Sequence, residues 1–315
     1  MAKFGRAWKR PGCPGFPGGE GADYIGAARQ FNDPKRPFRR MDEPTLARIA
    51  AALERLAPEP KPADLSGADC FQWSAMGLAP AHAPRRVPLD LLLEVDAQKE
   101  KLLANTRRFA AGAPANNALL WGVRGAGKSA LVKAVHAAVV GEGATLKLVE
   151  AATQDLDRIG TLLAALDAQD APAILFLDDL SFHGDEAALK TLKPALDGGL
   201  ARGGRVIVYA TSNRRHLVER DARENSDDLL WKDTAEEHLA LADRFGLWLG
   251  FHAIDQAAYL RIVRAYAKRF ALPIADGELE REALLWSRTR AARSGRTAWQ
   301  FIVDLAGRLE KDVAF

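Results

Sequence analysis

The residues with the clearest chemical meaning are 122–129, which read GVRGAGKS. The glycines allow backbone conformations that a Cβ would forbid, so several N–H groups can turn toward one anion. The pattern G-x-x-x-x-G-K-[ST] is typical of a loop that binds nucleotide phosphates: Lys128 would reach the β- and γ-phosphates, and the Ser129 hydroxyl would ligate Mg²⁺. The expected cofactor-binding residues are consecutive: Gly122, Val123, Arg124, Gly125, Ala126, Gly127, Lys128, Ser129 and Ala130.

The segments on either side of this loop support the same interpretation. An apolar run, residues 117–121, precedes the loop, and the apolar segment 130–140 follows it. A strand, a glycine loop and a helix in this order place the phosphate at a helix N-terminus, where the helix dipole favours negative charge. This context favours a phosphate loop over an ordinary glycine turn.

Two adjacent acids, Asp178 and Asp179, end the apolar run ILFLDD. At the carboxyl end of a buried strand beside a phosphate loop, such acids suit metal binding and water activation. We expect Asp178 to hold Mg²⁺, directly or through water, and Asp179 to orient or polarise the attacking water. The alternative is a pair of acids that caps a helix after the strand.

Three further residues are candidates by their positions. Asn213 follows the apolar run RVIVYATS, where its amide could hydrogen-bond a γ-phosphate or the attacking water, or could form a turn. Arg244 lies just before the apolar run LWLGF, and Arg296 opens a predicted helix. Arginine is always charged and can grip phosphate oxygens with two N–H groups, although by position alone a surface or capping arginine is the commoner case.

The composition excludes several classes of protein. The chain has 315 residues, 48% hydrophobic and 27% charged, with a net charge of +3, which fits a globular protein of one large or two domains. No apolar run approaches about 18 residues and the basic N-terminal segment lacks an apolar stretch, so we expect no membrane span, no secretory signal and a cytoplasmic location. Cys13 and Cys70 lie far apart, in segments that look poorly structured, and lack metal-ligand spacing.

Four regions follow one another along the chain. Residues 1–40 are rich in Gly, Pro, Lys and Arg and predict a disordered basic tail, with a nucleic-acid or membrane-surface tether as the alternative. Residues 41–89 combine a predicted helix, 43–57, with a Pro-rich linker. Residues 90–253 alternate helices with apolar runs, and residues 254–315 hold helices without strands.

The alternation predicts the fold class: α/β, a P-loop NTPase with a five-stranded parallel sheet flanked by helices, plus a small C-terminal α-helical domain. The expected strands are 118–122, 145–151, 173–179, 205–213 and 247–253. The expected helices outside the sheet region are 255–270, 276–290 and 295–315, and the helix before the first of these strands is 96–111.

In this order the motifs resemble the AAA+ ATPase superfamily over about residues 90–310: GVRGAGKS, ILFLDD, ATSN, LADRFG and SGRT. Segments such as ANNALLWGVRGAGKS, FLDDLSF, VYATSNRRHL and DRFGLWLGF are similar to the bacterial family named domain of unknown function 815, whose members are called ATP-binding proteins and have no settled substrate. The resemblance implies ATP and Mg²⁺ as cofactors, a helical lid at the C-terminal end and assembly into a homo-oligomer.

The resemblance also implies a role for each matching residue. Asn213 would be sensor 1, Arg244 would be the finger that reaches a neighbouring subunit's nucleotide, and Arg296 would be the lid arginine on the γ-phosphate. The segment 94–98 would lie near adenine. The expected catalytic residues are therefore Asp179, Asn213, Arg244 and Arg296, and the expected metal ligands are Ser129 and Asp178.

The chain departs from the superfamily pattern at three places. Asp179 stands where many members have Glu, and the side chain shorter by one methylene implies weaker water activation. The segment 150–160 lacks the aromatic–hydrophobic–Gly element of protein-threading members, which counts against an unfoldase. Residues 217–238 form an acidic insertion, either a partner-binding or oligomer-contact loop or a solvated loop.

These motifs leave several functions open. The leading hypothesis is an ATPase whose turnover remodels an unknown protein client, and the second is an ATP-dependent loader or switch with slow hydrolysis. A third is a nucleic-acid-binding module that uses the basic tail and needs ATP only to assemble. A small-molecule kinase is disfavoured because it leaves the lid, Asn213 and Arg244 unexplained, and we expect no membrane partner.

Overall fold

The computed structural model describes residues 42–56, 64–74, 76–81, 86–180, 192–193, 196, 205–213 and 243–314. Contacts divide the chain into two units, residues 1–59 and 60–315. In the first unit, α2 (Glu43–Leu56) is an amphipathic helix with exposed Leu46 and Ile49. The expected basic tail and the acidic insertion lie outside the described residues.

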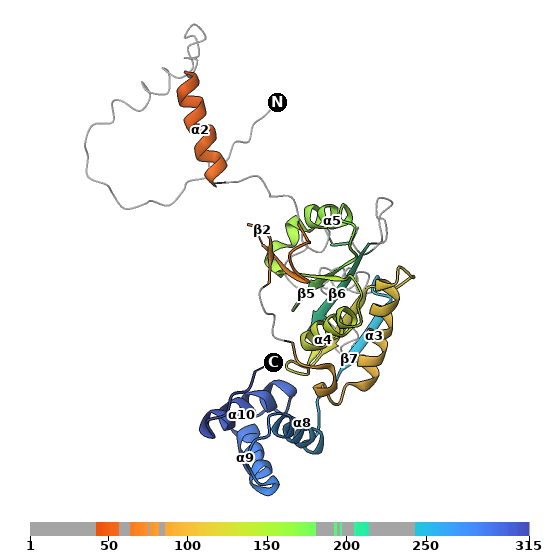
Figure 1. The fold of residues 1–315 in the computed structure, drawn as a ribbon, viewed down its shortest axis with the longest axis vertical. Coiled ribbons are helices and arrows are strands. Elements are labelled where there is room, and N and C mark those ends of the chain that lie inside the picture. Colours follow the sequence, from red (N-terminus) through yellow and green to blue (C-terminus); the bar gives the residue numbers. More distant parts are fainter. Residues whose placement is uncertain are drawn as a thin grey trace, which may run out of the picture. The chain divides into compact units, whose positions relative to one another are not determined.

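The second unit is built on a seven-stranded sheet (Figure 1). Its strands are β1 (Cys70–Ser74), β2 (Gly77–Pro80), β3 (Ala118–Gly122), β4 (Lys147–Ala151), β5 (Ala173–Leu177), β6 (Val206–Ser212) and β7 (Leu247–Phe251). Their order across the sheet is β2-β1-β4-β5-β6-β3-β7, with β1 and β2 antiparallel and all other neighbours parallel. The α/β class and the five predicted strands are confirmed, but the sheet has seven strands rather than five.

The two strands that the sequence did not predict form a hairpin in the segment expected to be linker. Phe71 and Trp73 of β1 are buried while Gln72 between them is exposed, and β1 extends the sheet by pairing in parallel with β4. β2 ends at Pro80, a residue that lacks the N–H of a ladder bond and is therefore confined to sheet edges. Both strands are short and flanked by prolines, so their composition looked like a linker.

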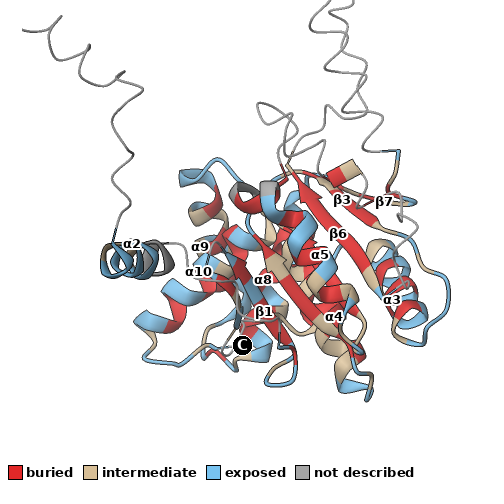
Figure 2. Ribbon diagram, turned by 90° about the horizontal axis from the view of Figure 1, so that it is seen from above, coloured by how far each residue is buried: buried red, intermediate tan, exposed pale blue. Residues whose placement is uncertain are grey.

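Helices cover both faces of the sheet (Figure 2). α3 (Asp96–Ala110) and α4 (Lys128–Gly141) pack on one face, and η2 (Thr153–Arg158) with α5 (Ile159–Asp167) pack on the other. Adjacent strand residues point to opposite faces: Leu119 of β3 joins the α5 cluster and Leu120 joins the α3–α4 cluster. This double burial explains why the strands read as continuous apolar runs.

The C-terminal helices form a third core beside the sheet (Figure 1). They are α8 (Gln256–Arg269), α9 (Asp276–Thr289) and α10 (Gly295–Arg308), and α10 ends earlier than the predicted 295–315. Tyr259, Val263 and Phe301 are buried between them, together with Leu91 from the short helix η1 (Leu89–Leu91). The helical group is thus tied to the segment that precedes α3.

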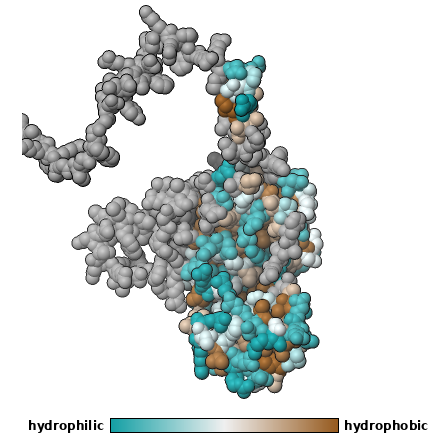
Figure 3. Space-filling view, turned by 90° about the vertical axis from the view of Figure 1, so that its left-hand side faces the viewer, coloured by the Kyte–Doolittle hydropathy of each residue, from teal (hydrophilic) through white to brown (hydrophobic). Residues whose placement is uncertain are grey.

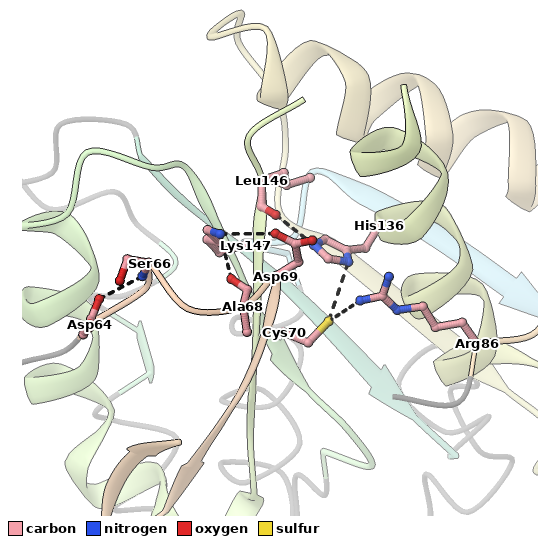
Figure 4. A network of polar contacts seen from close by, with 9 residues as sticks. All are labelled: Asp64, Ser66, Ala68, Asp69, Cys70, Arg86, His136, Leu146 and Lys147. Carbon is pink, nitrogen blue, oxygen red and sulfur yellow. Dashed lines mark hydrogen bonds and ion pairs between the residues drawn. The ribbon is translucent and has the colours of Figure 1, made fainter. Parts of the chain in front are cut away.

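Cys70 lies in a buried polar network rather than in a poorly structured segment (Figure 4). Its Sγ accepts a 2.8 Å hydrogen bond from Arg86 Nη2 and lies 3.8 Å from His136 Nδ1. His136 Nε2 lies 3.0 Å from the Leu146 carbonyl oxygen, which can only accept, so Nε2 carries the proton and Nδ1 faces the thiol with its lone pair. Burial raises the pKa of Cys70, so the network is a neutral thiol–imidazole pair. The expectation for Cys70 was wrong, and Cys13 lies outside the described residues.

The surface of the second unit is partly hydrophilic and partly hydrophobic. On the face in Figure 3, hydrophilic areas are interrupted by smaller hydrophobic ones. Among the described residues, no helix has both the length and the apolar character to cross a membrane.

Candidate functional site

The glycine-rich loop joins the end of β3 to the beginning of α4, as predicted. Gly122 has φ 127°, and a Cβ there would lie 2.0 Å from the carbonyl oxygen of Phe251 on β7. Gly125 has φ 79°, and a Cβ there would lie 2.9 Å from Ser294 Oγ. The loop can therefore pass close to β7 and to the C-terminal helices because these positions have no side chain.

Lys128, the first residue of α4, is 5% exposed and points back across the loop. Its Nζ donates three hydrogen bonds of 2.9 Å, to the carbonyl oxygens of Gly122 and Val123 and to Asn213 Oδ1. Burial lowers the pKa of Lys128 to about 8, although the carboxylates of Asp179 and Asp178 oppose the shift. The amine is thus mostly charged at neutral pH, and three uncharged oxygen acceptors hold it against the loop.

Asp178 receives two hydroxyl groups on the same oxygen. Ser129 Oγ and Thr211 Oγ1 each donate a 2.6 Å hydrogen bond to Asp178 Oδ1. Distances of this size are typical of O–H···O⁻ bonds to a carboxylate. Because its proton goes to Asp178, the Ser129 hydroxyl keeps its lone pairs for a cation.

Asp179 occupies a corner of the chain just beyond β5. Its φ of 57° is left-handed, which is uncommon for a residue with a side chain. Its carboxylate oxygen Oδ1 accepts a hydrogen bond from Asn213 Nδ2. Asn213 therefore bridges Lys128 and Asp179.

The lid expected from the resemblance contacts the loop through the beginning of α10. The Arg296 N–H donates a 3.2 Å hydrogen bond to the Gly125 carbonyl oxygen, and Ser294 Oγ caps the helix by accepting from the Thr297 N–H at 3.2 Å. The Arg296 side chain is exposed and lines the same cavity as the loop.

A cavity of about 950 Å³ lies between the carboxyl edge of the sheet and the C-terminal helices. It is lined by Val123–Ala130, both acids after β5, Asn213, and residues of α8 and α10. Of the expected adenine segment 94–98, Glu94, Val95 and Gln98 line the cavity. Glu94 accepts two hydrogen bonds from Arg261 of α8, at 2.6 and 2.9 Å, so this wall of the cavity is tied to the helical group.

The structure brings most of the predicted site residues together, with one exception. Arg244 is partly buried, next to buried Phe245 before β7, and is not among the residues that line the cavity.

Sequence reasoning missed the part played by Thr211 and the Arg261–Glu94 pair. Thr211 could have been suspected, because it lies two positions before Asn213 in the predicted strand 205–213, where alternation would put both side chains on one face. Arg261 and Glu94 are 167 positions apart, and the sequence holds no sign of their contact.

The residues present fit Mg²⁺ and a nucleotide. Mg²⁺ prefers oxygen ligands and keeps waters and substrate phosphates in its shell, and the Ser129 hydroxyl with the Asp178 carboxylate supplies such oxygens. Among the described residues no group of three or more His, Cys, Asp or Glu side chains could hold a metal ion by itself. The donor set therefore suits a cation that arrives with a phosphate ligand.

The sheet, the glycine loop and the helical group beside it form an α/β fold that resembles that of the AAA+ P-loop ATPases, as the motifs indicated. A mutant of RuvB from Thermotoga maritima shares this fold with 18% identity and a TM-score of 0.51, over 74% of this chain and 70% of that one. ORC1 from Aeropyrum pernix, solved in complex with DNA, shares it with 15% identity and a TM-score of 0.50, over 72% of this chain and 66% of that one.

The chain belongs to the family described as "Protein of unknown function (DUF815)", whose model matches residues 66–309. No curated protein matches the sequence.

Proposed function

We propose that this protein binds Mg-ATP in the cavity between the sheet and the C-terminal helices and hydrolyses it to ADP and phosphate. The observation that carries the proposal is a set of hydrogen bonds at the glycine loop, in two branches that Thr211 connects by its bonds to Asp178 Oδ1 and to the Asp179 N–H. Lys128, Asn213 and Asp179 form one branch of it, and Ser129 and Asp178 form the other. A structural lysine or a capping acid does not explain this convergence of an amine, a hydroxyl and two carboxylates on an open cavity.

The loop and the metal ligands would hold the triphosphate. The N–H groups of the loop and the amine of Lys128 would bind the β- and γ-phosphates at the N-terminus of α4. Ser129 and Asp178 would hold Mg²⁺, which when bound neutralises charge on the phosphate oxygens.

Asp179 and Asn213 would act on the attacking water. The Asp179 carboxylate would accept a hydrogen bond from water and turn its lone pair toward the γ-phosphate, and it would take the proton as the bond to phosphorus forms. Asn213 already holds one Asp179 oxygen with its amide, which fixes the direction of the carboxylate. Arg296, at the edge of the cavity, would pair with γ-phosphate oxygens.

Arg244 is assigned to a neighbouring copy of the chain. It lies outside the lining of its own cavity, so as a finger it would serve the nucleotide of another subunit in a homo-oligomer. Turnover would then move the α-helical lid domain, residues 254–315, against the nucleotide-binding domain, residues 90–253, and remodel an unknown protein client.

A second candidate function is an ATP-dependent loader or switch with slow hydrolysis, with nucleic acid as its candidate partner. Asp179 has a short side chain, and its Oδ1 is already bound by Asn213, so one oxygen is less available to water. Steady phosphate release over many turnovers favours the remodelling ATPase, and stable retention of ATP favours the switch.

Calorimetric titration of ATP with and without Mg²⁺, together with phosphate release, tests the proposal. Lys128→Ala should abolish or severely weaken ATP binding. Lys133→Ala is the matched control, because Lys133 lies on the same helix, pairs with Glu150 at 2.8 Å and does not line the cavity. Unchanged ATP affinity in Lys128→Ala would contradict the nucleotide site itself.

A further inference from the structure

Thr211 lies at the point of the sheet where the two halves of the proposed site meet. β6 lies between β5, which leads into the acid pair, and β3, which leads into the glycine loop. Leu177, the last residue of β5, pairs with Ala210, and Leu120 of β3 pairs with Thr211 itself. Thr211 is 2% exposed and is among the residues that line the cavity, so its side chain is almost buried at the edge of the cavity.

The hydroxyl of Thr211 makes two hydrogen bonds with the acid pair. It donates to Asp178 Oδ1 at 2.6 Å and accepts from the backbone N–H of Asp179 at 2.8 Å. The Thr211 carbonyl oxygen also accepts from the Leu180 N–H at 2.7 Å. One residue of β6 therefore contacts all three residues of the corner that follows β5.

The hydrogen bonds of Thr211 to the N–H groups of Asp179 and Leu180 continue the contact between β5 and β6 beyond their last paired residues. The pairing of β5 with β6 stops at Leu177, and Asp179 then turns into the left-handed region. A residue with a side chain persists there when its surroundings hold it, because the conformation costs about 1–3 kcal/mol. The two N–H bonds to Thr211 supply that support.

The same hydroxyl sets the direction of the Asp178 carboxylate. Ser129 and Thr211 approach Oδ1 from the loop and from β6, so this oxygen is held from two sides, and Oδ2 accepts neither bond. A carboxylate fixed in this way presents its remaining lone pairs to a cation without losing rotational freedom when the cation binds.

We propose that Thr211 is a positioning residue of the nucleotide site: its hydroxyl orients Asp178 toward Mg²⁺ and holds the backbone of Asp179 so that its carboxylate faces the attacking water. This role rests on the proposed function. Thr211 would thus act on the metal ligand Asp178, whereas Asn213 acts on the carboxylate of Asp179.

Two substitutions separate the hydroxyl from the methyl group. Thr211→Val keeps the shape of the side chain and removes the hydroxyl, whereas Thr211→Ser keeps the hydroxyl and removes the methyl group. The measured quantity is the Mg²⁺ advantage, defined as the ratio of ATP affinities with and without Mg²⁺ from calorimetry. Phosphate release is the second readout.

Thr211→Val should lower the Mg²⁺ advantage and the turnover by about 10–100-fold, the usual cost of losing a group that orients a metal ligand. ATP affinity without Mg²⁺ should stay at the wild-type value, because the loop and Lys128 are untouched. Thr211→Ser should stay close to wild type in all three measurements. The reverse pattern, a normal Val variant and a defective Ser variant, would show that Thr211 serves packing and overturn the proposal.

Tyr209→Phe is the matched control. Tyr209 lies two positions earlier on the same face of β6, is fully buried, and its hydroxyl is bonded to Asn105 at 3.1 Å and Thr106 at 2.8 Å. This variant should lose stability toward urea but keep the wild-type Mg²⁺ advantage. If it loses the Mg²⁺ advantage to the same extent as Thr211→Val, the effect is a general weakening of β6 and the proposal is wrong.

The outcomes also separate this inference from the function on which it rests. A wild-type protein that does not bind ATP overturns both, whereas normal Mg-ATP binding in wild type and in Thr211→Val overturns the positioning role alone. Should Thr211→Val not fold, Thr211→Ala and Thr211→Ser form the deciding pair: the proposal expects the Mg²⁺ advantage to be lost in Ala and kept in Ser.

Discussion

Lys128 Nζ donates a 2.9 Å hydrogen bond to Asn213 Oδ1, although the two residues are 85 positions apart in the chain. The amide of the same asparagine donates to Asp179 Oδ1. The group expected to meet the phosphates and the group expected to act on water are therefore connected through one side chain. Phosphate binding by Lys128 and water activation by Asp179 can still be separated by mutation, because Asn213 bonds Lys128 through Oδ1 and Asp179 through Nδ2.

Asp179→Asn should leave Mg-ATP affinity near the wild-type value and lower turnover by roughly 10²–10⁴-fold, the usual contribution of a general base. An amide cannot take a proton from water, but it still fills the same space. Asp178→Asn should in addition raise the Mg²⁺ concentration needed for binding. Asp170→Asn, at an exposed residue paired with Arg205, serves as the control. Wild-type turnover in Asp179→Asn would exclude it as the base and make Glu186, outside the described residues, the next acid to test.

ATP affinity should weaken above pH 8. Burial holds the pKa of Lys128 at about 8 in the free protein, and a bound phosphate needs the charged amine. The pKa of Lys128 lies below the ordinary lysine value of 10.5, so the charged form is lost as pH rises through 8, and affinity should fall by about tenfold for each further pH unit. Calorimetry at pH 8.5 in buffers of different ionisation enthalpy should show proton uptake on binding. Constant affinity from pH 7 to 9.5 would contradict this prediction.

Gly122→Ala should destabilise the protein strongly. The new Cβ would overlap the Phe251 carbonyl oxygen at 2.0 Å, and alanine is strained at φ 127°. The sum of overpacking and backbone strain is roughly 2–6 kcal/mol of unfolding free energy. Gly141→Ala, in the last turn of α4 with no atom within 4 Å of the new Cβ, should be neutral or stabilising. Urea unfolding of the two variants checks the difference, and equal midpoints would refute the steric argument.

The parts of the site that the sequence predicted share one property: the chemistry and the local structure are encoded within a few consecutive residues. The segment GVRGAGKS contains the glycines of the turn, the cationic Lys128 and the hydroxyl of Ser129. The acids Asp178 and Asp179 come directly after an apolar strand. The contacts of Thr211 with that corner depend instead on which strands are neighbours in the sheet. No local sequence pattern predicts the order of strands in the sheet.

The hairpin at residues 70–80 was missed for a different reason. β1 and β2 have five and four residues, too few to give a clear alternation, and prolines surround them. Their stability comes from pairing with β4 and from burial of Phe71 and Trp73. A tertiary contact thus overrides a local composition that is typical of a linker.

His136 should make the protein sensitive to acid. Burial lowers the pKa of His136 to about 4 from the ordinary histidine value of 6.5. The unfolded chain therefore takes up a proton below pH 6.5 that the folded protein refuses until about pH 4, so stability is complete above pH 6.5 and falls as pH drops toward 4. The loss at pH 4.5 should be about 2–3 kcal/mol.

Urea unfolding at pH 7 and pH 4.5 tests this. The wild type should lose more stability between the two values than His136→Gln, which is less stable at pH 7 but has no imidazole to protonate. An equal loss in both proteins would assign the acid sensitivity to other groups.

Arg244 decides whether the proposed ATPase works alone or in an assembly. The residue lies before β7 and outside the lining of its own cavity, so a role in catalysis requires a second copy of the chain. A guanidinium that stabilises the transferring phosphoryl group is worth roughly 10³–10⁵-fold in rate. Arg244→Ala should therefore bind ATP normally and turn it over far more slowly, while Arg281→Ala, at an exposed position on α9, should resemble wild type.

Mixing two inactive variants gives the sharpest test of that assignment. Lys128→Ala lacks a working loop but keeps Arg244, and Arg244→Ala lacks the finger but keeps the loop. In a mixed oligomer, some interfaces join an intact loop to an intact finger, so activity should reappear on mixing, and the specific activity of the wild type should rise with protein concentration. If mixed oligomers form and no activity returns, or if Arg244→Ala is as active as wild type, Arg244 does not act across subunits and is a surface arginine beside β7.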